Sequence, residues 1–329
     1  MSSIREKQSK ISSLFVKMNQ KQQLQHAYIF EGARGVGKYD MAKWISQMIY
    51  CQNLTDEGEP CLECNQCQRI ENEEHPDVVT MRPDGASIKV RQVREIKEEF
   101  SKSGMESRKK ILIIKEMDKM TPSGANSLLK FIEEPEGEIT IILLTTEVQK
   151  LLPTIVSRCQ TIHFQTTNIE SRIASIKAED IPEEFATILA YLTQDSKVAR
   201  EIYEDEDFKK IIQTVWQWFV LLNKNNNQAF IYVHTNIMPL AKNKEESNLL
   251  LNLLLILYRD LMALTFEQEH LTAFSKYESQ LKNMIDHSIQ KNISKILVSI
   301  LDAQKKLSNH VAAQGLFEQI VLEIKKMSQ

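Results

Sequence analysis

Three short apolar runs in the first half of the chain limit the folds that are open to it. They are residues 27–30 (AYIF), 111–114 (ILII) and 139–145 (ITIILLT), and each is bounded by polar or glycine-containing stretches. Continuous runs rich in β-branched residues are typical of parallel strands that are buried on both faces. Because helical patterns lie between the runs, the sequence predicts an α/β domain.

One of these helical patterns has clear signals at both ends. Thr121 and Pro122 offer a cap followed by proline at the first helical position, and Pro135 ends the segment. Leu128 and Ile132 recur between them at helical spacing. We therefore expect a helix that begins at about residue 122.

After about residue 166 the strand signal fades and helical patterns replace it. Residues 166–208 hold short amphipathic segments, which predict a small helical domain. Residues 209–329 hold long helical patterns, which predict an all-helical domain, with Trp216 and Trp218 in its core. A chain of 329 residues is long enough for two or three domains. We expect the α/β domain over residues 1–165 and these two helical domains after it.

The charge balance and the apolar runs exclude some classes of protein. Lys plus Arg number 41 against 44 for Asp plus Glu, so the net charge of −3 gives no global attraction to nucleic acid or to an anionic membrane. The first ten residues are polar, unlike a secretory signal. The strongest apolar run, residues 249–258, falls short of the ~20 residues that span a bilayer. We expect a soluble cytoplasmic protein with no membrane partner.

The segment EGARGVGKYD follows the first apolar run and resembles a phosphate-binding loop. It supplies Gly32, Gly35, Gly37 and Lys38. Backbone N–H groups of such a loop, together with the helix N-terminus, cradle phosphate. However, Tyr39 stands where a Ser or Thr would ligate Mg²⁺, and a phenol is too long and rigid for that role. Metal-assisted phosphoryl transfer should be weak or absent, and a glycine-rich turn without a ligand is the structural alternative.

A second departure from an ATPase follows the run at residues 111–114. An ATPase of this layout needs an Asp and a Glu there, but Lys115 and Glu116 stand instead. A lysine in the Asp position would repel Mg²⁺. We interpret Tyr39 and Lys115 as two independent defects of one site. The alternative is an active ATPase in which Glu116 or Asp118 holds the metal.

Four of the five cysteines lie in the segment CQNLTDEGEPCLECNQC. They are Cys51, Cys61, Cys64 and Cys67. Two overlapping C-x-x-C steps and a fourth cysteine upstream suit tetrahedral Zn²⁺, and four thiolates leave no open position for chemistry. The sequence therefore predicts a structural zinc site, with His75 nearby as a structural residue. Redox chemistry and unligated thiols are the alternatives.

Ser157, Arg158 and Cys159 follow a short helical pattern and precede an apolar strand. Arginine presents a planar fork that suits phosphate oxygens. An arginine supplied by a neighbouring subunit accelerates hydrolysis by about 10³–10⁵. The structural alternative is an ordinary surface charge.

The order of these segments resembles the clamp-loader subunits of bacterial DNA polymerase III, which are members of the AAA+ family. The segments that carry the resemblance are HAYIFEGARGVGK, the four-cysteine insert, HPDVVTMRPDGASIKVRQVREI, ANSLLKFIEEPEG and LLTTEVQKLLPTIVSRCQ, followed by a helical tail. The resemblance is dense over about residues 24–165 and weaker in the tail. It implies a RecA-like AAA+ domain with a zinc-binding insert, a small helical lid and a helical collar through which five subunits oligomerise.

The resemblance also implies roles for single residues. Arg158 would reach the ATP site of an adjacent motor subunit, and the four cysteines would be the zinc ligands. Motor subunits keep Ser or Thr after the loop lysine and an acidic pair after the strand, so Tyr39 and Lys115 indicate the non-hydrolysing kind of subunit. Val198 stands at a position where active members carry a nucleotide-sensing arginine, and Arg200 lies two residues further on.

The family then implies a stator-like subunit that is not an enzyme by itself. It would complete a hetero-pentamer with motor subunits and a clamp-opening subunit, and would support loading of the sliding clamp onto primed DNA during chromosome replication. The sequence leaves open whether ATP binds without being hydrolysed. An active motor subunit of the same assembly is the nearest alternative. A P-loop kinase would leave the cysteine insert and the helical tail unexplained, and a zinc-dependent nucleic-acid-binding module would require a basic helix after the cysteines.

Overall fold

The computed structural model forms two compact units, Met1–Thr167 and Asn168–Gln329, which are described separately. The residues that it describes are 4–101, 107–134, 137–224, 227–268, 271–309 and 311–327.

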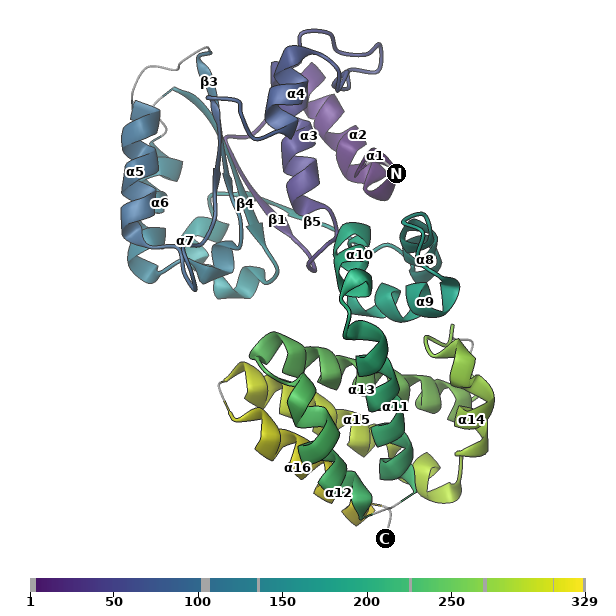
Figure 1. Ribbon diagram of the computed structural model, residues 1–329. Helices are drawn as coiled ribbons and strands as arrows, with labels where there is room; N and C mark the ends of the chain where they lie inside the picture. Colours follow the sequence, from purple (N-terminus) through teal and green to yellow (C-terminus); the bar gives the residue numbers. More distant parts are fainter. Residues whose placement is uncertain are drawn as a thin grey trace. The chain divides into compact units, whose positions relative to one another are not determined.

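Unit 1 is built on a parallel sheet whose strand order is β2-β3-β4-β1-β5 (Figure 1). The strands are β1 (Ala27–Glu31), β2 (Val78–Met81), β3 (Lys109–Ile114), β4 (Glu138–Thr145) and β5 (Gln160–His163). The three apolar runs form β1, β3 and β4, as predicted, and β5 is the strand expected after Cys159. The sequence analysis missed β2, which is short and only partly buried over most of its length.

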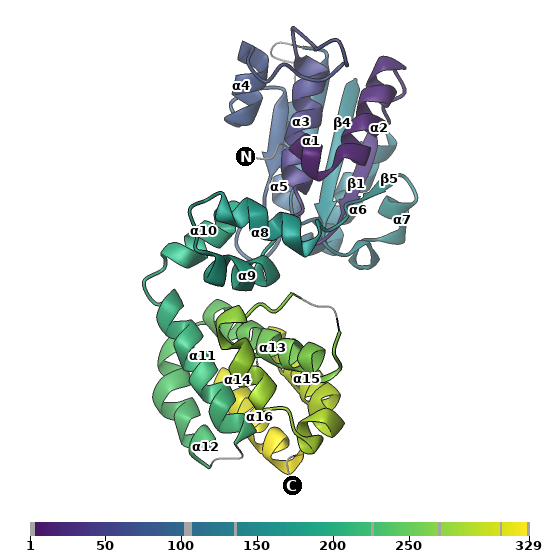
Figure 2. The ribbon, with the colours of Figure 1, turned by 90° about the vertical axis from the view of Figure 1, so that its right-hand side faces the viewer.

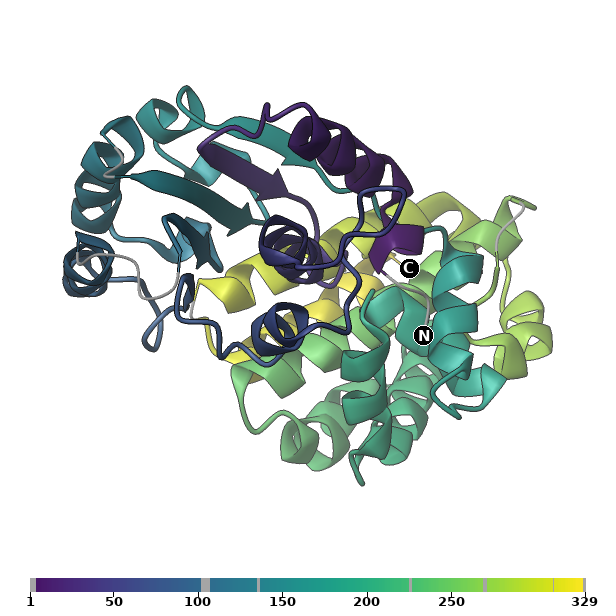
Figure 3. The ribbon, with the colours of Figure 1, turned by 90° about the horizontal axis from the view of Figure 1, so that it is seen from above.

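Helices cover both faces of this sheet (Figures 1 and 3). Side chains of Tyr28 and Phe30 face one helical layer, and those of Ala27 and Ile29 face the other, as the alternation of a strand requires. The first layer contains α1 (Ile4–Lys7), α2 (Ser9–Gln20) and α3 (Lys38–Tyr50), with α4 (Asn65–Glu71) beside α3. The second layer contains α5 (Val90–Ser101), α6 (Pro122–Glu133) and α7 (Pro153–Val156), and the short turns η1 (Met117–Lys119) and η2 (Val148–Lys150) follow β3 and β4.

The predicted start of α6 is confirmed. Thr121 precedes the helix, its hydroxyl accepts a hydrogen bond from the N–H of Gly124 at 3.3 Å, and Pro122 is the first helical residue. Such a cap satisfies one of the N–H groups that a helix start leaves without a partner. The helix ends at Glu133, and Pro135 lies outside the described residues.

Unit 2 contains helices and no strand among its described residues (Figure 2). One buried apolar cluster runs through it from Ile173 to Ile324, and it includes Trp216 and Trp218, which confirms that both tryptophans pack in a core. A division into a lid and a collar near residue 208 stays a prediction. The α-helices are α8 (Ile169–Lys177), α9 (Glu183–Leu192), α10 (Ser196–Glu204), α11 (Phe208–Asn223), α12 (Gln228–Tyr232), α13 (Lys244–Thr265), α14 (Glu278–Asn283), α15 (His287–Ser308) and α16 (Ala313–Met327). A short π-helix, η3 (Val233–Ile237), and two 3₁₀-helices, η4 (Met238–Leu240) and η5 (Ser275–Tyr277), lie between them.

Helix α13 contains the strongest apolar run of the sequence. It has 22 residues, and among the described helices it alone has the length and apolar composition to cross a membrane. However, 56% of its most apolar window is buried inside the protein. Leu250, Leu254 and Leu257 belong to the core of unit 2, which accounts for the apolar composition of the helix.

Candidate functional site

The predicted phosphate loop connects β1 to α3. Gly35 and Gly37 have φ angles of 79° and 86°, in the left-handed region that favours glycine. The ammonium of Lys38 donates hydrogen bonds to the carbonyl oxygens of Gly32 (2.5 Å) and Ala33 (2.7 Å). The loop therefore closes around the lysine, which lies at the first position of the helix.

The environment of Lys38 disfavours its charged form. Burial lowers the pKa of Lys38 to about 8, and the negative charge of Asp118 opposes that change. Asp118 is held in place by the hydroxyl of Thr145, which donates to its carboxylate at 3.1 Å. An ammonium whose charged form is poorly solvated gains from the negative charge of a bound anion.

The N-terminal helices hold the loop from outside, a contact that the sequence analysis missed. The side-chain amide of Gln8 donates to the carbonyl oxygen of Val36 at 3.1 Å and to that of Gln165 at 2.9 Å. The terminal methyl of Ile4 lies where a side chain on Gly37 would project, and the φ of 86° at Gly37 strains any residue with a side chain. One buried amide thus joins the phosphate loop to the segment that follows β5.

The side chains of Tyr39 and Lys115, the two departures from an ATPase, contact each other. The Lys115 Nζ lies 3.4 Å from the centroid of the Tyr39 ring, within the range of a cation–π interaction. The Tyr39 hydroxyl lies 3.3 Å from that of Thr80 on β2. Burial, and after it the positive charge of Arg82, lower the pKa of Lys115. The two unusual residues are therefore one contact pair.

The carboxylate that follows Lys115 is engaged by two cations. Glu116 accepts from Arg34 of the phosphate loop at 3.3 Å and pairs with Lys119 at 2.5 Å. Its backbone has a φ of 51°, which is unusual for a residue with a side chain. Glu116 therefore forms ion pairs with Arg34 and Lys119. The carboxylate whose negative charge acts on Lys38 is that of Asp118.

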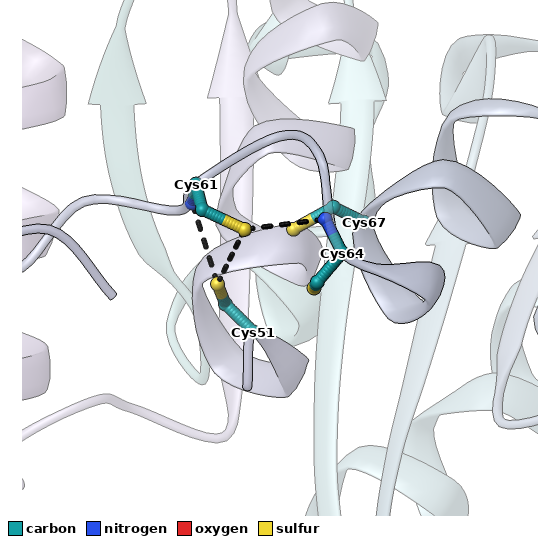
Figure 4. A group of neighbouring side chains, drawn as sticks. All are labelled: Cys51, Cys61, Cys64 and Cys67. Carbon is teal, nitrogen blue, oxygen red and sulfur yellow. Dashed lines mark hydrogen bonds between the residues drawn. The ribbon is translucent and has the colours of Figure 1, made fainter. Parts of the chain in front are cut away.

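The structure brings the four predicted zinc ligands together (Figure 4). The sulfur atoms of Cys51, Cys61, Cys64 and Cys67 all lie within 4.8 Å of one another, and those of Cys51 and Cys61 are 3.5 Å apart. A tetrahedral site with Zn–S bonds of about 2.3 Å places its sulfurs roughly 3.8 Å apart. The donor set and its spacing therefore fit Zn²⁺.

Backbone N–H groups support this cluster. The N–H of Cys61 donates to the sulfur of Cys51, and the N–H of Cys64 donates to the sulfur of Cys61, both at 3.3 Å. Burial raises the pKa of Cys64, but several hydrogen bonds, first that of the Gln52 backbone, lower it to about 6. His75 is not part of this group: its Nδ1 accepts from the backbone N–H of Asp77.

The cysteine module is joined to the helices around the phosphate loop. Gln47 of α3 donates to the carbonyl oxygen of Cys67 at 3.0 Å, and Lys43 of the same helix pairs with Glu71 at 2.7 Å. On the other side, Arg5 of α1 pairs with Glu57 at 2.6 Å. The module therefore braces both α3 and the N-terminal helices.

Arg158 follows α7 and lies at the surface of unit 1. Its Nε donates to the carboxylate of Glu133 at 2.7 Å, and its Nη1 donates to the carbonyl oxygen of Thr154 at 3.1 Å and to the hydroxyl of Ser157 at 3.3 Å. Burial raises the pKa of the Cys159 thiol to about 12, which disfavours the thiolate form. The sequence analysis missed Glu133 as the partner of Arg158.

Val198, which stands where active members carry a nucleotide-sensing arginine, and Arg200 both lie on α10 in unit 2. Val198 is 39% exposed. Arg200 pairs with Glu204 at 2.8 Å and with Glu179 at 3.7 Å, so its guanidinium is engaged within this unit.

Comparison with known proteins places the chain in a family. The profile of the family described as "DNA polymerase III, delta subunit" matches residues 7–168. DNA polymerase III subunit delta' of Bacillus subtilis (strain 168) is 35% identical over 321 residues, which cover 98% of this chain and 97% of that protein. The chain belongs to the delta' family.

DNA polymerase III subunits of other bacteria match a smaller part of the chain. Subunit delta' of Pseudomonas aeruginosa is 32% identical over 55% of this chain and 55% of its own length. Subunit gamma/tau of Mycoplasma pneumoniae is 36% identical over 53% of this chain, but the chain spans only 25% of that protein. The resemblance to subunits of this polymerase is therefore confirmed, and it reaches nearly full length with the Bacillus subtilis delta' subunit.

Proposed function

We propose that this chain is a stator-like subunit of a clamp loader, with the AAA+ architecture over residues 1–165. The observation that carries the proposal is the 35% identity with a delta' subunit over 98% of the chain. In this role it completes a hetero-pentamer with motor subunits and a clamp-opening subunit, and it supports loading of a sliding clamp onto primed DNA. It thereby acts as a component of the DNA polymerase III holoenzyme in the cytoplasm.

The contact between Tyr39 and Lys115 supports the absence of hydrolysis. Metal-assisted transfer needs a small hydroxyl ligand after the loop lysine and a carboxylate after the strand. Here an aromatic ring and an ammonium group pack against each other at these positions. The cation repels Mg²⁺, so we expect no ATP hydrolysis by the chain alone.

Three further parts of the proposal concern the rest of the assembly. The four-cysteine cluster holds a structural Zn²⁺. Residues 166–208 form a lid and residues 209–329 form a collar through which the subunits associate. Arg158 enters the ATP site of a neighbouring motor subunit, where its guanidinium stabilises the charge of the transferred phosphoryl group.

The test is ATP turnover by the purified chain, alone and mixed with motor and clamp-opening subunits, clamp and primed DNA. The chain alone should be inactive, and the mixture should lose most of its stimulated turnover when Arg158→Ala replaces the wild type. Lys150→Ala is a matched control, since Lys150 also forms a surface ion pair, with Glu147 at 2.7 Å. Equal turnover with Arg158→Ala and wild type would refute the role of Arg158.

An active motor subunit is the second candidate, and one observation favours it. The carboxylate of Asp118 acts electrostatically on Lys38, so an acidic group does lie near the phosphate loop. Turnover of ATP by the isolated chain in Mg²⁺, lost in Asp118→Asn, would establish that candidate in place of the stator.

A further inference from the structure

We propose that Glu133 is the positioning residue for Arg158, and that it holds the guanidinium in the orientation in which it meets a neighbour's phosphate. This inference rests on the proposed role of Arg158. Glu133 lies in the segment ANSLLKFIEEP, whose glutamates have no other role in the proposed function.

The place of Glu133 in its helix is unfavourable for a carboxylate. It is the last residue of α6, where the partial negative charge of the helix terminus repels an anion and favours a cation such as Lys130. Helix stability therefore does not explain a glutamate here. The ion pair with Arg158 at 2.7 Å does explain it.

The hydrogen bonds of Arg158 leave one side of its guanidinium open. Nε is held by Glu133, and Nη1 is held by the carbonyl oxygen of Thr154 and the hydroxyl of Ser157. Among the described residues Nη2 has no hydrogen-bond partner. The two N–H groups of Nη2 can thus donate to phosphate oxygens, while the hydrogen bonds of Nε and Nη1 fix the plane of the guanidinium.

The two elements that carry this pair share a rigid support. Both helices pack on the same face of the sheet (Figure 1), and they share one buried apolar cluster there. This cluster includes Phe131 and Ile132 of α6 and Ile155 of α7. The carboxylate is therefore fixed relative to the arginine backbone. An arginine that is already ordered loses less conformational freedom when it binds its target.

The strength of the pair matters less than its geometry. Both side chains are 42% exposed, and ion pairs at such positions contribute little to stability. The carboxylate also neutralises part of the charge that would attract phosphate. Its removal should therefore leave folding and assembly unchanged, and it should affect the rate of the chemical step through the placement of the guanidinium.

The experiment measures kcat and KM for ATP of the reconstituted complex that contains Glu133→Ala, which removes the acceptor for the Arg158 Nε, with Glu134→Ala as the matched control. Glu134 is the adjacent exposed glutamate. We expect Glu133→Ala to lower kcat by roughly tenfold with KM unchanged, because a misplaced catalytic group costs rate and not substrate binding. Glu134→Ala should match wild type, and all variants should assemble equally in size-exclusion chromatography.

A double variant separates this inference from the proposed function. Glu133→Ala in an Arg158→Ala background should cause no further loss, because Glu133 acts through Arg158. An additional loss in that background, or wild-type kcat for Glu133→Ala while Arg158→Ala is impaired, would overturn the inference alone. Wild-type turnover with Arg158→Ala would instead overturn the proposed function on which it rests.

Discussion

The contact between Tyr39 and Lys115 predicts a measurable energetic coupling between the two residues. The variants are Tyr39→Leu, which keeps an apolar side chain without the aromatic face, and Lys115→Met, which keeps most of the lysine stem without its charge. A double-mutant cycle of wild type, both single variants and the double variant isolates the pairwise interaction. The separate effects of Lys115 on other charges cancel in such a cycle.

The geometry sets the expected magnitude. The Lys115 ammonium is 3.4 Å from the centroid of the ring, and both residues are only partly buried. Cation–π pairs contribute about 0.5–1 kcal/mol at exposed sites and about 2 kcal/mol when desolvated. We therefore expect a coupling of about 1 kcal/mol. Lys43, at 5.6 Å from the same ring, should couple less strongly and serves as the internal control.

Native-state hydrogen exchange of the β3 amides is the suitable assay, because β3 ends directly before Lys115 and belongs to unit 1. The free energy of opening for these amides, compared across the four proteins, gives the coupling. If the effects of the two substitutions on the free energy of opening add, with a coupling below about 0.3 kcal/mol, the contact contributes nothing to stability and the reasoning is refuted.

Two further predictions concern the metal and the loop lysine. Elemental analysis of the purified chain should find one zinc ion per molecule. Cys67→Ser should abolish zinc binding and increase hydrogen exchange of the α4 amides. Cys159→Ser, which changes the cysteine outside the cluster, should retain the metal. Lys38→Met removes two hydrogen bonds to loop carbonyl oxygens as well as a charge, so the informative quantity is the pH dependence of its stability relative to wild type. Burial lowers the folded-state pKa of Lys38 to about 8, below its value near 10.5 in the unfolded chain. The unfolded wild type therefore binds more protons between these values, and wild-type stability should rise with pH across that window relative to Lys38→Met. A stability difference that is constant with pH would contradict the assignment.

Features encoded in short stretches could be predicted from the sequence. The four cysteines fall within one segment, so their spacing alone indicated that their sulfurs meet. Thr121 and Pro122 likewise marked the start of α6 through local chemistry. The buried strands β1, β3 and β4 were evident because strands covered on both faces must be continuously apolar.

Features that depend on distant residues could not be predicted. Tyr39 and Lys115 meet only because β2 and β3 bring their ends beside α3, and no pattern in either segment indicates the other. The pair of Glu133 and Arg158 similarly depends on how α6 and α7 pack on one core. Strand β2 was missed because it is only four residues long, too short for a clear apolar run.

The order of strands in unit 1 has a consequence for synthesis of the chain. The first strand, β1, lies between β4 and β5, so Ala27 pairs with Ile141 and Tyr28 pairs with Gln160. At the usual rate of translation on the ribosome, about 5–20 residues per second, both neighbours of β1 emerge only after roughly 5–25 s. During that interval an apolar strand has neither of its edges paired, which is the condition that favours aggregation. A nascent chain of this protein therefore depends on chaperones or on early burial of β1 against α2 and α3 until residue 163 has left the exit tunnel.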